Sequence, residues 1–250
     1  MKKTVRIELY KSLHYWVVWA ILIFCIVGSA ALIYDSQYAS EIARLPRAQY
    51  SVFVRQSARF MMLMEVLLTA YLCTADFALK TVQNILSIGV GRKQFFISKL
   101  IMLALSTMFL YAVSWTSYGI AYSIQNKGRA IVITKGELAI IFLVAILQIW
   151  SYCAVTNLVG IFCRNQSVTM IAGFGWMVME ILLGATLDLY GVEISAMDML
   201  PLMVLQRSTD YVVSGLIYDS SFWISGIYAV VSIIIASVIG YIWFSRTDVY

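Results

Sequence analysis

The sequence predicts an all-α integral membrane protein with six transmembrane helices. Hydrophobic residues make up 62% and charged residues 12% of the 250 residues, whereas soluble domains have about 45–50% and about 25%. Six stretches are apolar and long enough to cross a bilayer, which takes about 20 residues in an α-helix. No polar block is long enough to form a core of its own, so we expect one membrane domain over residues 1–250.

The six predicted spans differ in how purely apolar they are. They cover residues 14–34, 59–79, 100–124, 138–162, 168–188 and 222–244. The second contains Glu65 and Asp76, and the fifth contains Glu180. A basic leader precedes the first span, but the uncharged run that follows is longer than the apolar core of a signal peptide. We therefore expect this run to remain as a membrane span.

Both termini are predicted to lie in the cytoplasm. An even number of spans returns the chain to the side where it began, and basic residues favour the cytoplasmic side. With the N-terminus inside, ten of the 18 lysines and arginines fall on the cytoplasmic side and eight outside. Because these residues flank apolar runs, they indicate contact with anionic lipid headgroups rather than with nucleic acid.

The sequence offers no catalytic or metal-binding motif. It has no phosphate-binding loop of the form GxxxxGK[ST], so the chain cannot hydrolyse ATP alone. The only histidine is His14, which leaves neither a zinc HExxH motif nor a serine–histidine pair. The four cysteines lie in or beside apolar runs without metal-ligand spacing. We expect no catalytic residue, no metal site and no cofactor on this chain, which is not predicted to be an enzyme.

A polar, basic segment, residues 76–99, joins the second and third spans. Helical spacing places four polar residues on one stripe and apolar side chains on the other side. The four are Lys80, Gln83, Asn84 and Ser87. Such a helix is expected to lie along the inner membrane surface with its stripe toward the cytoplasm, and to end at Gly89. The simplest alternative is a helix that only anchors the loop.

This segment, "DFALKTVQNILSIGVGRKQFFISKLI", resembles the cytoplasmic coupling region of ABC-2-type permeases, the membrane subunits of ATP-driven exporters. The positions that match the family pattern in order are Asp76, Thr81, Asn84, Leu86, Gly89, Arg92 and Lys99. Asp76 stands where Glu is usual, and Lys80 stands where Gly is common. The opening, "RIELYKSLHYWVVWAIL", resembles the amphipathic helix that precedes the first span in this family, with Val5, Leu9 and Leu13 on one face.

The resemblance implies a set of partners and coupling residues. In the family, two permease chains form the pathway, and each coupling helix docks on a separate cytoplasmic ATPase that holds ATP and Mg²⁺. The expected partners are an ATPase dimer, a second copy of the chain or a related permease, and membrane lipid, in the plasma membrane of a bacterium. Short re-entrant helices are expected between the fifth and sixth spans. The ATPase-coupling residues would be Asp76, Lys80, Thr81, Gln83, Asn84, Ser87, Gly89, Arg92 and Lys99.

Acidic and polar residues are candidates for contact with a substrate. A carboxylate at bilayer depth is costly and usually faces a partner or a cavity. The candidate pathway residues are Glu65, Glu180, Gln148 and Asn157, and the alternative is that they only bond one helix to another. An acidic outer mouth is predicted from Asp188, Glu193, Asp198, Asp210 and Asp219. Here the alternative is that the acids serve only topology and solubility.

The residues and the resemblance together favour a permease subunit that exports an amphipathic peptide or an antibiotic-like substrate. The small size resembles the peptide, bacteriocin and antibiotic self-protection branch of the family. An acidic, apolar outer mouth would attract a cationic substrate of this kind. Two alternatives stay open: a non-transporting membrane protein that binds a toxin or peptide for immunity or sensing, and a substrate-binding membrane component of an importer.

Overall fold

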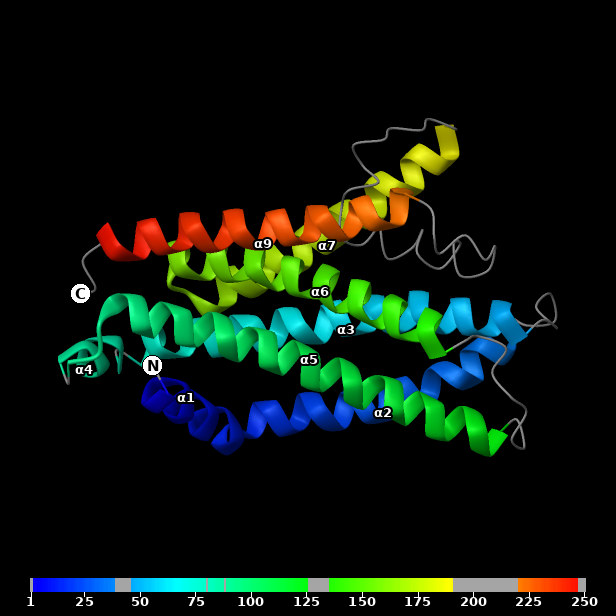
Figure 1. Ribbon diagram of the computed structural model, residues 1–250, viewed down its shortest axis with the longest axis horizontal. Helices are drawn as coiled ribbons and strands as arrows, with labels where there is room; N and C mark the ends of the chain where they lie inside the picture. Colours follow the sequence, from blue (N-terminus) through cyan, green and yellow to red (C-terminus); the bar gives the residue numbers. More distant parts are fainter. Residues whose placement is uncertain are drawn as a thin grey trace.

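The computed structural model of the protein describes residues 2–38, 46–79, 81–87, 89–125, 135–190 and 220–246. Within these ranges the regular structure is α-helical (Figure 1). The helices are α1 (Lys2–His14), α2 (Trp16–Tyr38), α3 (Pro46–Ala78), α4 (Thr81–Ser87), α5 (Arg92–Gln125), α6 (Lys135–Cys163), α7 (Gln166–Tyr190) and α9 (Ser220–Arg246). The all-α prediction is confirmed for this part of the chain.

Five of these helices are long and apolar enough to cross a membrane. They are α3, α5, α6, α7 and α9, with candidate spans at Phe60–Phe77, Arg92–Ala121, Ala139–Cys163, Gln166–Leu187 and Gly226–Arg246. A sixth crossing is obtained only when α1 and α2 are taken together, and this pair bends by 68° at a break between them. The chain is thus a multi-pass membrane protein by length and composition, while the count of six spans and the cytoplasmic termini stay predictions.

Two helices begin well before the predicted spans. α3 starts at Pro46, although the second span is predicted from residue 59. Proline is compatible with the first turn of a helix because the amide groups there have no partner within the helix. α5 starts at Arg92, before the predicted start of the third span at residue 100. In α3 hydropathy marks only Phe60–Phe77, and polar residues extend the helix before it. In α5 the apolar part already begins at Arg92.

α1 is amphipathic, as predicted, and its polar face is turned inward. Thr4, Glu8 and Ser12 recur every four residues and are buried, because residues at this spacing share one face of a helix. Leu9 and Leu13 on the other side are exposed. An apolar face directed outward suits a helix that lies against lipid. The inward polar face brings charged groups to the interior.

The core of the bundle lies between α2, α3, α5 and α6. α6 packs against α3, α7 and α9, and α2 packs against α3 and α5. Fully buried side chains of this core include Met61, Leu68, Leu103, Tyr111 and Ile149. α1, α4 and the C-terminal end of α9 lie at one end of the bundle, which we call the α4 end (Figure 1). The predicted re-entrant helices fall within residues 191–219, outside the described residues.

Candidate functional site

α4 is a seven-residue helix that lies between α3 and α5 at the α4 end of the bundle. Its inner side carries Val82, which is buried, and Ile85 and Leu86, which are half-buried. These side chains belong to one apolar cluster with residues of three spans. The buried members from those spans are Phe95 and Phe96 of α5, Ile161 of α6 and Phe244 of α9. α4 therefore rests on the ends of the membrane helices.

The outer side of α4 is polar. Gln83, Asn84 and Ser87 are all exposed, which confirms the predicted stripe for these three residues, while Lys80 lies outside the described part of the chain. A turn follows at Gly89, whose φ of +91° lies in the left-handed region that favours glycine. The polar side of α4 is therefore the exposed one among the described residues, and the turn that ends it is the one predicted.

Arg92, the first residue of α5, faces the bundle. Its side chain is half-buried, and its Nη1 donates a hydrogen bond to the backbone carbonyl of Ser245 at 2.8 Å. This bond joins the start of α5 to the end of α9. The guanidinium of Arg92 is thus engaged within the α4 end, and its predicted place among the coupling residues stays a prediction.

Four charged side chains form a cluster beside α4, which we call the charge cluster. They are Glu8 and Lys11 of α1, Asp76 of α3 and Lys99 of α5. Lys99 Nζ lies 2.6 Å from Glu8 Oε2 and also contacts a carboxylate oxygen of Asp76. Lys11 Nζ lies 2.9 Å from Asp76 Oδ1 and 3.4 Å from Glu8 Oε1. The charges of the two acidic and the two basic side chains thus cancel, and charged groups shielded from water require such pairing.

The charge cluster connects α4 to three other helices. The hydroxyl group of Thr81, the first residue of α4, donates a hydrogen bond to Asp76 Oδ1 at 2.7 Å. Lys99 Nζ in turn donates to the carbonyl of Leu72 in α3 at 2.9 Å. Hydrogen bonds and ion pairs are electrostatically stronger in a site shielded from water. α1, α3, α4 and α5 are therefore held together at this point.

Asp76 and Lys99, predicted as coupling residues, lie in the interior. Their exposed fractions are 2% and 8%, so in this structure both side chains contact other helices rather than the surface, and their part in coupling stays a prediction. Glu8 and Lys11 are functional candidates that sequence reasoning missed. Their signal was the i, i+3 spacing of opposite charges, which places both on one face of the leader helix.

The candidate pathway residue Glu65 is fully buried in α3. Its Oε2 lies 3.3 Å from Thr107 Oγ1 of α5 and 3.8 Å from Cys153 Sγ of α6. Its Oε1 has no hydrogen-bond partner among the described residues. The carboxyl group thus bridges three helices, which is the geometry of the interhelical alternative.

The other three candidate pathway residues are buried as well. Glu180 of α7 accepts a hydrogen bond from Trp176 Nε1, one turn earlier in the same helix. Gln148 and Asn157 are buried in α6. Of the predicted outer-mouth acids, Asp188 belongs to α7, and the others, Glu193, Asp198, Asp210 and Asp219, lie outside the described residues. The acidic mouth stays a prediction.

The chain was also compared with known protein families. A family model described as ABC-2 family transporter protein matches residues 4–180. The match covers well over half of the chain and takes in α1, α4 and the whole charge cluster. No curated protein matches the chain. The chain belongs to the ABC-2 family of transporter proteins.

Proposed function

We propose that the chain is the permease subunit of an ATP-driven exporter and that a separate cytoplasmic ATPase acts on α4. The observation that carries this proposal is the two-sided burial of α4. Gln83, Asn84 and Ser87 are exposed, while Val82 on the opposite side is held against the membrane helices. A helix that is exposed on one side and packed against the membrane helices on the other is suited to receive a force. The partner would bind ATP and Mg²⁺, because the chain has no phosphate-binding loop.

The fixed side of α4 offers two routes into the membrane helices. The apolar route runs from Val82 to Phe95 and Phe244, whose ring centroids are 5.7 Å apart. The polar route runs from Thr81 to Asp76 and on through the charge cluster to α1 and α5. Both routes consist of packed or bonded contacts, so a movement of α4 is expected to carry these helices with it. Such a movement would shift the membrane part between two conformational states.

The proposed substrate is an amphipathic, cationic peptide or an antibiotic-like molecule, moved out of the cell or out of the membrane. The support comes from composition, since residues 188–222 contain five acidic residues against Arg207 alone, a formal balance of −4. An acidic region raises the local concentration of cationic molecules. A second permease chain, identical or related, is proposed to complete the pathway in the plasma membrane.

Removing the polar stripe of α4 tests the coupling surface. The combined substitution of Gln83, Asn84 and Ser87 by alanine is expected to weaken the affinity for the co-purifying ATPase at least about tenfold, because a loss of about 1.4 kcal/mol at an interface has that effect. Transport-linked ATP hydrolysis should fall as less ATPase is bound. Alanine favours the helix, and exposed substitutions change stability by no more than about 0.5 kcal/mol. The measurements are ATPase activity in reconstituted vesicles, co-purification, and thermal unfolding of the chain.

A matched control removes two exposed hydroxyl groups, one near the C-terminal end of α5 and one near the C-terminal end of α7. Ser123→Ala in α5 and Thr186→Ala in α7 each remove a side chain that bonds only to its own helix in the described structure. The pair should leave hydrolysis and co-purification at the level of the unaltered chain. Full stimulation of the ATPase by the α4 variant would show that α4 is not the contact surface. ATPase binding without any vectorial flux would instead favour a non-transporting membrane protein.

Glu65→Gln separates a structural role from a role in the substrate pathway. Glutamine has the same shape as glutamate and keeps an oxygen for Thr107 and Cys153, so the free energy of unfolding should change by less than about 1 kcal/mol. Because Glu65 is enclosed, transport of a cationic peptide into vesicles should also be unchanged. A loss of transport by a stably folded variant would place the carboxylate in the pathway instead.

A further inference from the structure

α9 presents two different sides at the α4 end of the bundle. Its inner side carries Gly240 and Phe244, and a Cβ on Gly240 would lie 3.3 Å from Phe96 Cζ and 3.4 Å from Ile161 Cδ1. The opposite side carries a stripe of residues spaced three and four apart, as on one face of a helix. The stripe consists of Ile239, Ile242, Trp243 and Arg246. With Phe162 of α6 it lines an open groove of about 490 Å³.

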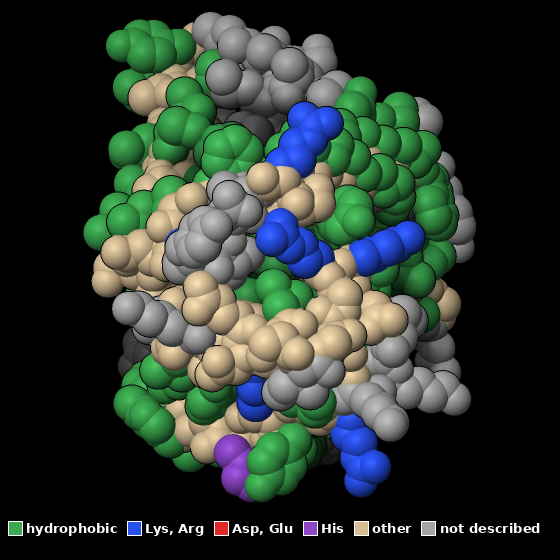
Figure 2. Space-filling model, turned by 90° about the vertical axis from the view of Figure 1, so that its left-hand side faces the viewer, with side chains coloured by type: hydrophobic (Ala, Val, Ile, Leu, Met, Phe, Trp, Pro, Cys, Tyr) green, Lys and Arg blue, Asp and Glu red, His purple; other side chains and the backbone are tan. Residues whose placement is uncertain are grey.

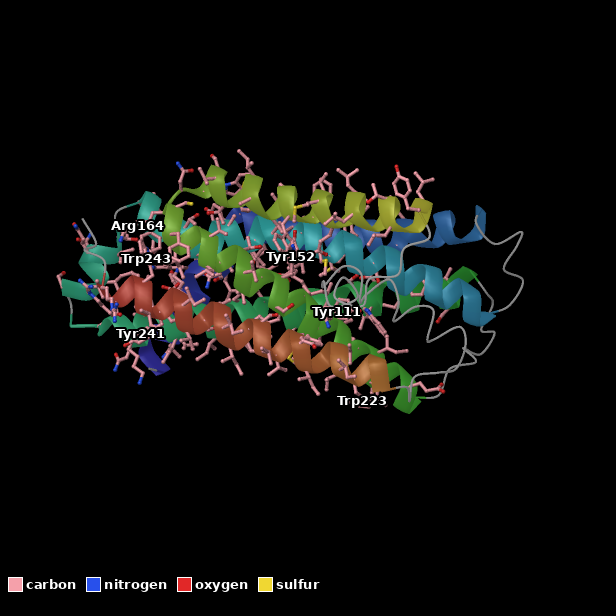
Figure 3. The ribbon with its side chains drawn as sticks, turned by 90° about the horizontal axis from the view of Figure 1, so that it is seen from above. Tyr111, Tyr152, Arg164, Trp223, Tyr241 and Trp243 are labelled. Carbon is pink, nitrogen blue, oxygen red and sulfur yellow. The ribbon has the colours of Figure 1, made fainter. Side chains whose placement is uncertain are left out.

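The walls of this groove are almost wholly apolar. The rings of Phe162 and Trp243 meet edge to face with centroids 4.9 Å apart, and both side chains are only partly buried, at 40% and 46% exposed. Figure 3 labels Trp243 and Arg164 at the same end of the bundle. Tryptophan is enriched where a membrane helix leaves the hydrocarbon. A groove with apolar walls at the end of a membrane span fits an acyl chain. A polar ligand in the same groove would find no partners for its hydrogen-bonding groups.

The end of the groove is positively charged. Arg246 is the last residue of the candidate span of α9 and is exposed. On the face that contains the α4 end, Figure 2 shows several lysine and arginine side chains and no acidic side chain among the described residues. A guanidinium group binds phosphate through two parallel N–H groups. The groove thus combines apolar walls with a phosphate-binding group at the end where a headgroup would lie.

We propose that this groove binds an anionic phospholipid, with an acyl chain along Phe162, Ile239 and Trp243 and the phosphate on Arg246. Assigning the lipid to the cytoplasmic leaflet rests on the proposed function, but binding itself does not. Trp243 precedes Phe244, which belongs to the apolar cluster beneath α4. A bound lipid would therefore stabilise the packing of α9 against α6, and α4 packs on the same apolar cluster.

Native mass spectrometry of the full chain in detergent, with equal amounts of phosphatidylglycerol and phosphatidylcholine, tests the site. The first lipid retained by the unaltered chain should be phosphatidylglycerol. Arg246→Gln should lower its preference over phosphatidylcholine about fivefold, the effect of one basic residue at a membrane surface. Arg246→Lys should keep most of the preference. Ile242→Trp, which fills the groove from an exposed position, should reduce retention of both lipids.

Lys93→Gln is the matched control, because Lys93 is exposed at the start of α5 and does not line the groove. Its preference for phosphatidylglycerol should equal that of the unaltered chain. Equal losses in Lys93→Gln and Arg246→Gln would overturn the site in favour of unspecific attraction by the basic face. Equal retention of both lipids by the unaltered chain would overturn it as well. Detergent has no leaflets and the ATPase is absent, so a failure of ATPase coupling leaves this result untouched.

Discussion

Replacing Lys99 by methionine is expected to lower the free energy of unfolding by about 3–5 kcal/mol, the cost of removing one partner from a buried ion pair. Lys99 Nζ contacts both Glu8 and Asp76 and is 8% exposed. Without it, Lys11 alone would face two buried carboxylates. The hydrogen bond to the carbonyl of Leu72 would also be lost. Unfolding of the purified chain by sodium dodecyl sulfate in mixed micelles, followed by circular dichroism, measures the change.

Two further variants make this result specific to charge balance. Lys93→Met makes the same substitution at an exposed position of the same helix, and it should change stability by no more than about 0.5 kcal/mol. The double variant Asp76→Asn/Lys99→Met leaves Glu8 paired with Lys11 and should cost less than the sum of the two single substitutions, because paired groups couple. If Lys99→Met is as mild as Lys93→Met, the charge cluster does not hold the α4 end together.

The charge cluster also shows what a sequence cannot reveal about a site. Lys11 and Asp76 are 65 positions apart in the chain. Lys11 belongs to a polar leader in which exposure is the ordinary expectation, and Asp76 lies near the end of the predicted second span. Their pairing, with Asp76 buried and Lys11 half-buried, follows only once the bend between α1 and α2 brings the leader back against α3 and α5. Arg92 is a similar case, since its acceptor belongs to Ser245 in the last helix. Pairings of this kind depend on tertiary contacts, which the periodicity of the sequence does not reveal.

The features that depend on local periodicity were predictable. Apolar runs give helices because backbone groups in hydrocarbon must bond within their own segment. The two sides of α4 follow from the spacing of Val82, Gln83 and Asn84 along one helix. The start of α3 at Pro46 was not predictable from hydropathy, because the residues before the span are polar. Sequence thus located the candidate coupling surface and named Asp76 and Lys99, but it missed Glu8 and Lys11, which pair with them.

Gly173→Ala is expected to lower the free energy of unfolding by about 2–3 kcal/mol, the upper part of the cost of overpacking a core. A Cβ at this position of α7 would lie 2.7 Å from Cγ1 of Val66 in α3 and 3.3 Å from Cγ2 of Thr156 in α6. Valine has one preferred rotamer in a helix, so its methyl groups cannot swing away. The same position is in contact with α6 through a hydrogen bond that Tyr152 donates to the carbonyl of Gly173. α7 would have to move away from α3 and α6.

Gly175→Ala is the matched control, because a Cβ there meets no atom within 4 Å. It should be neutral or slightly stabilising, since alanine favours a helix over glycine by about 1 kcal/mol. Adding Val66→Ala to Gly173→Ala should restore part of the lost stability, although Val66→Ala alone removes buried methyl groups and destabilises the core. Thermal unfolding of the four variants in detergent gives the coupling energy. Additive losses would mean that α7 does not rest on Val66, whereas a rescue shows that the absence of one side chain sets the distance between α3 and α7.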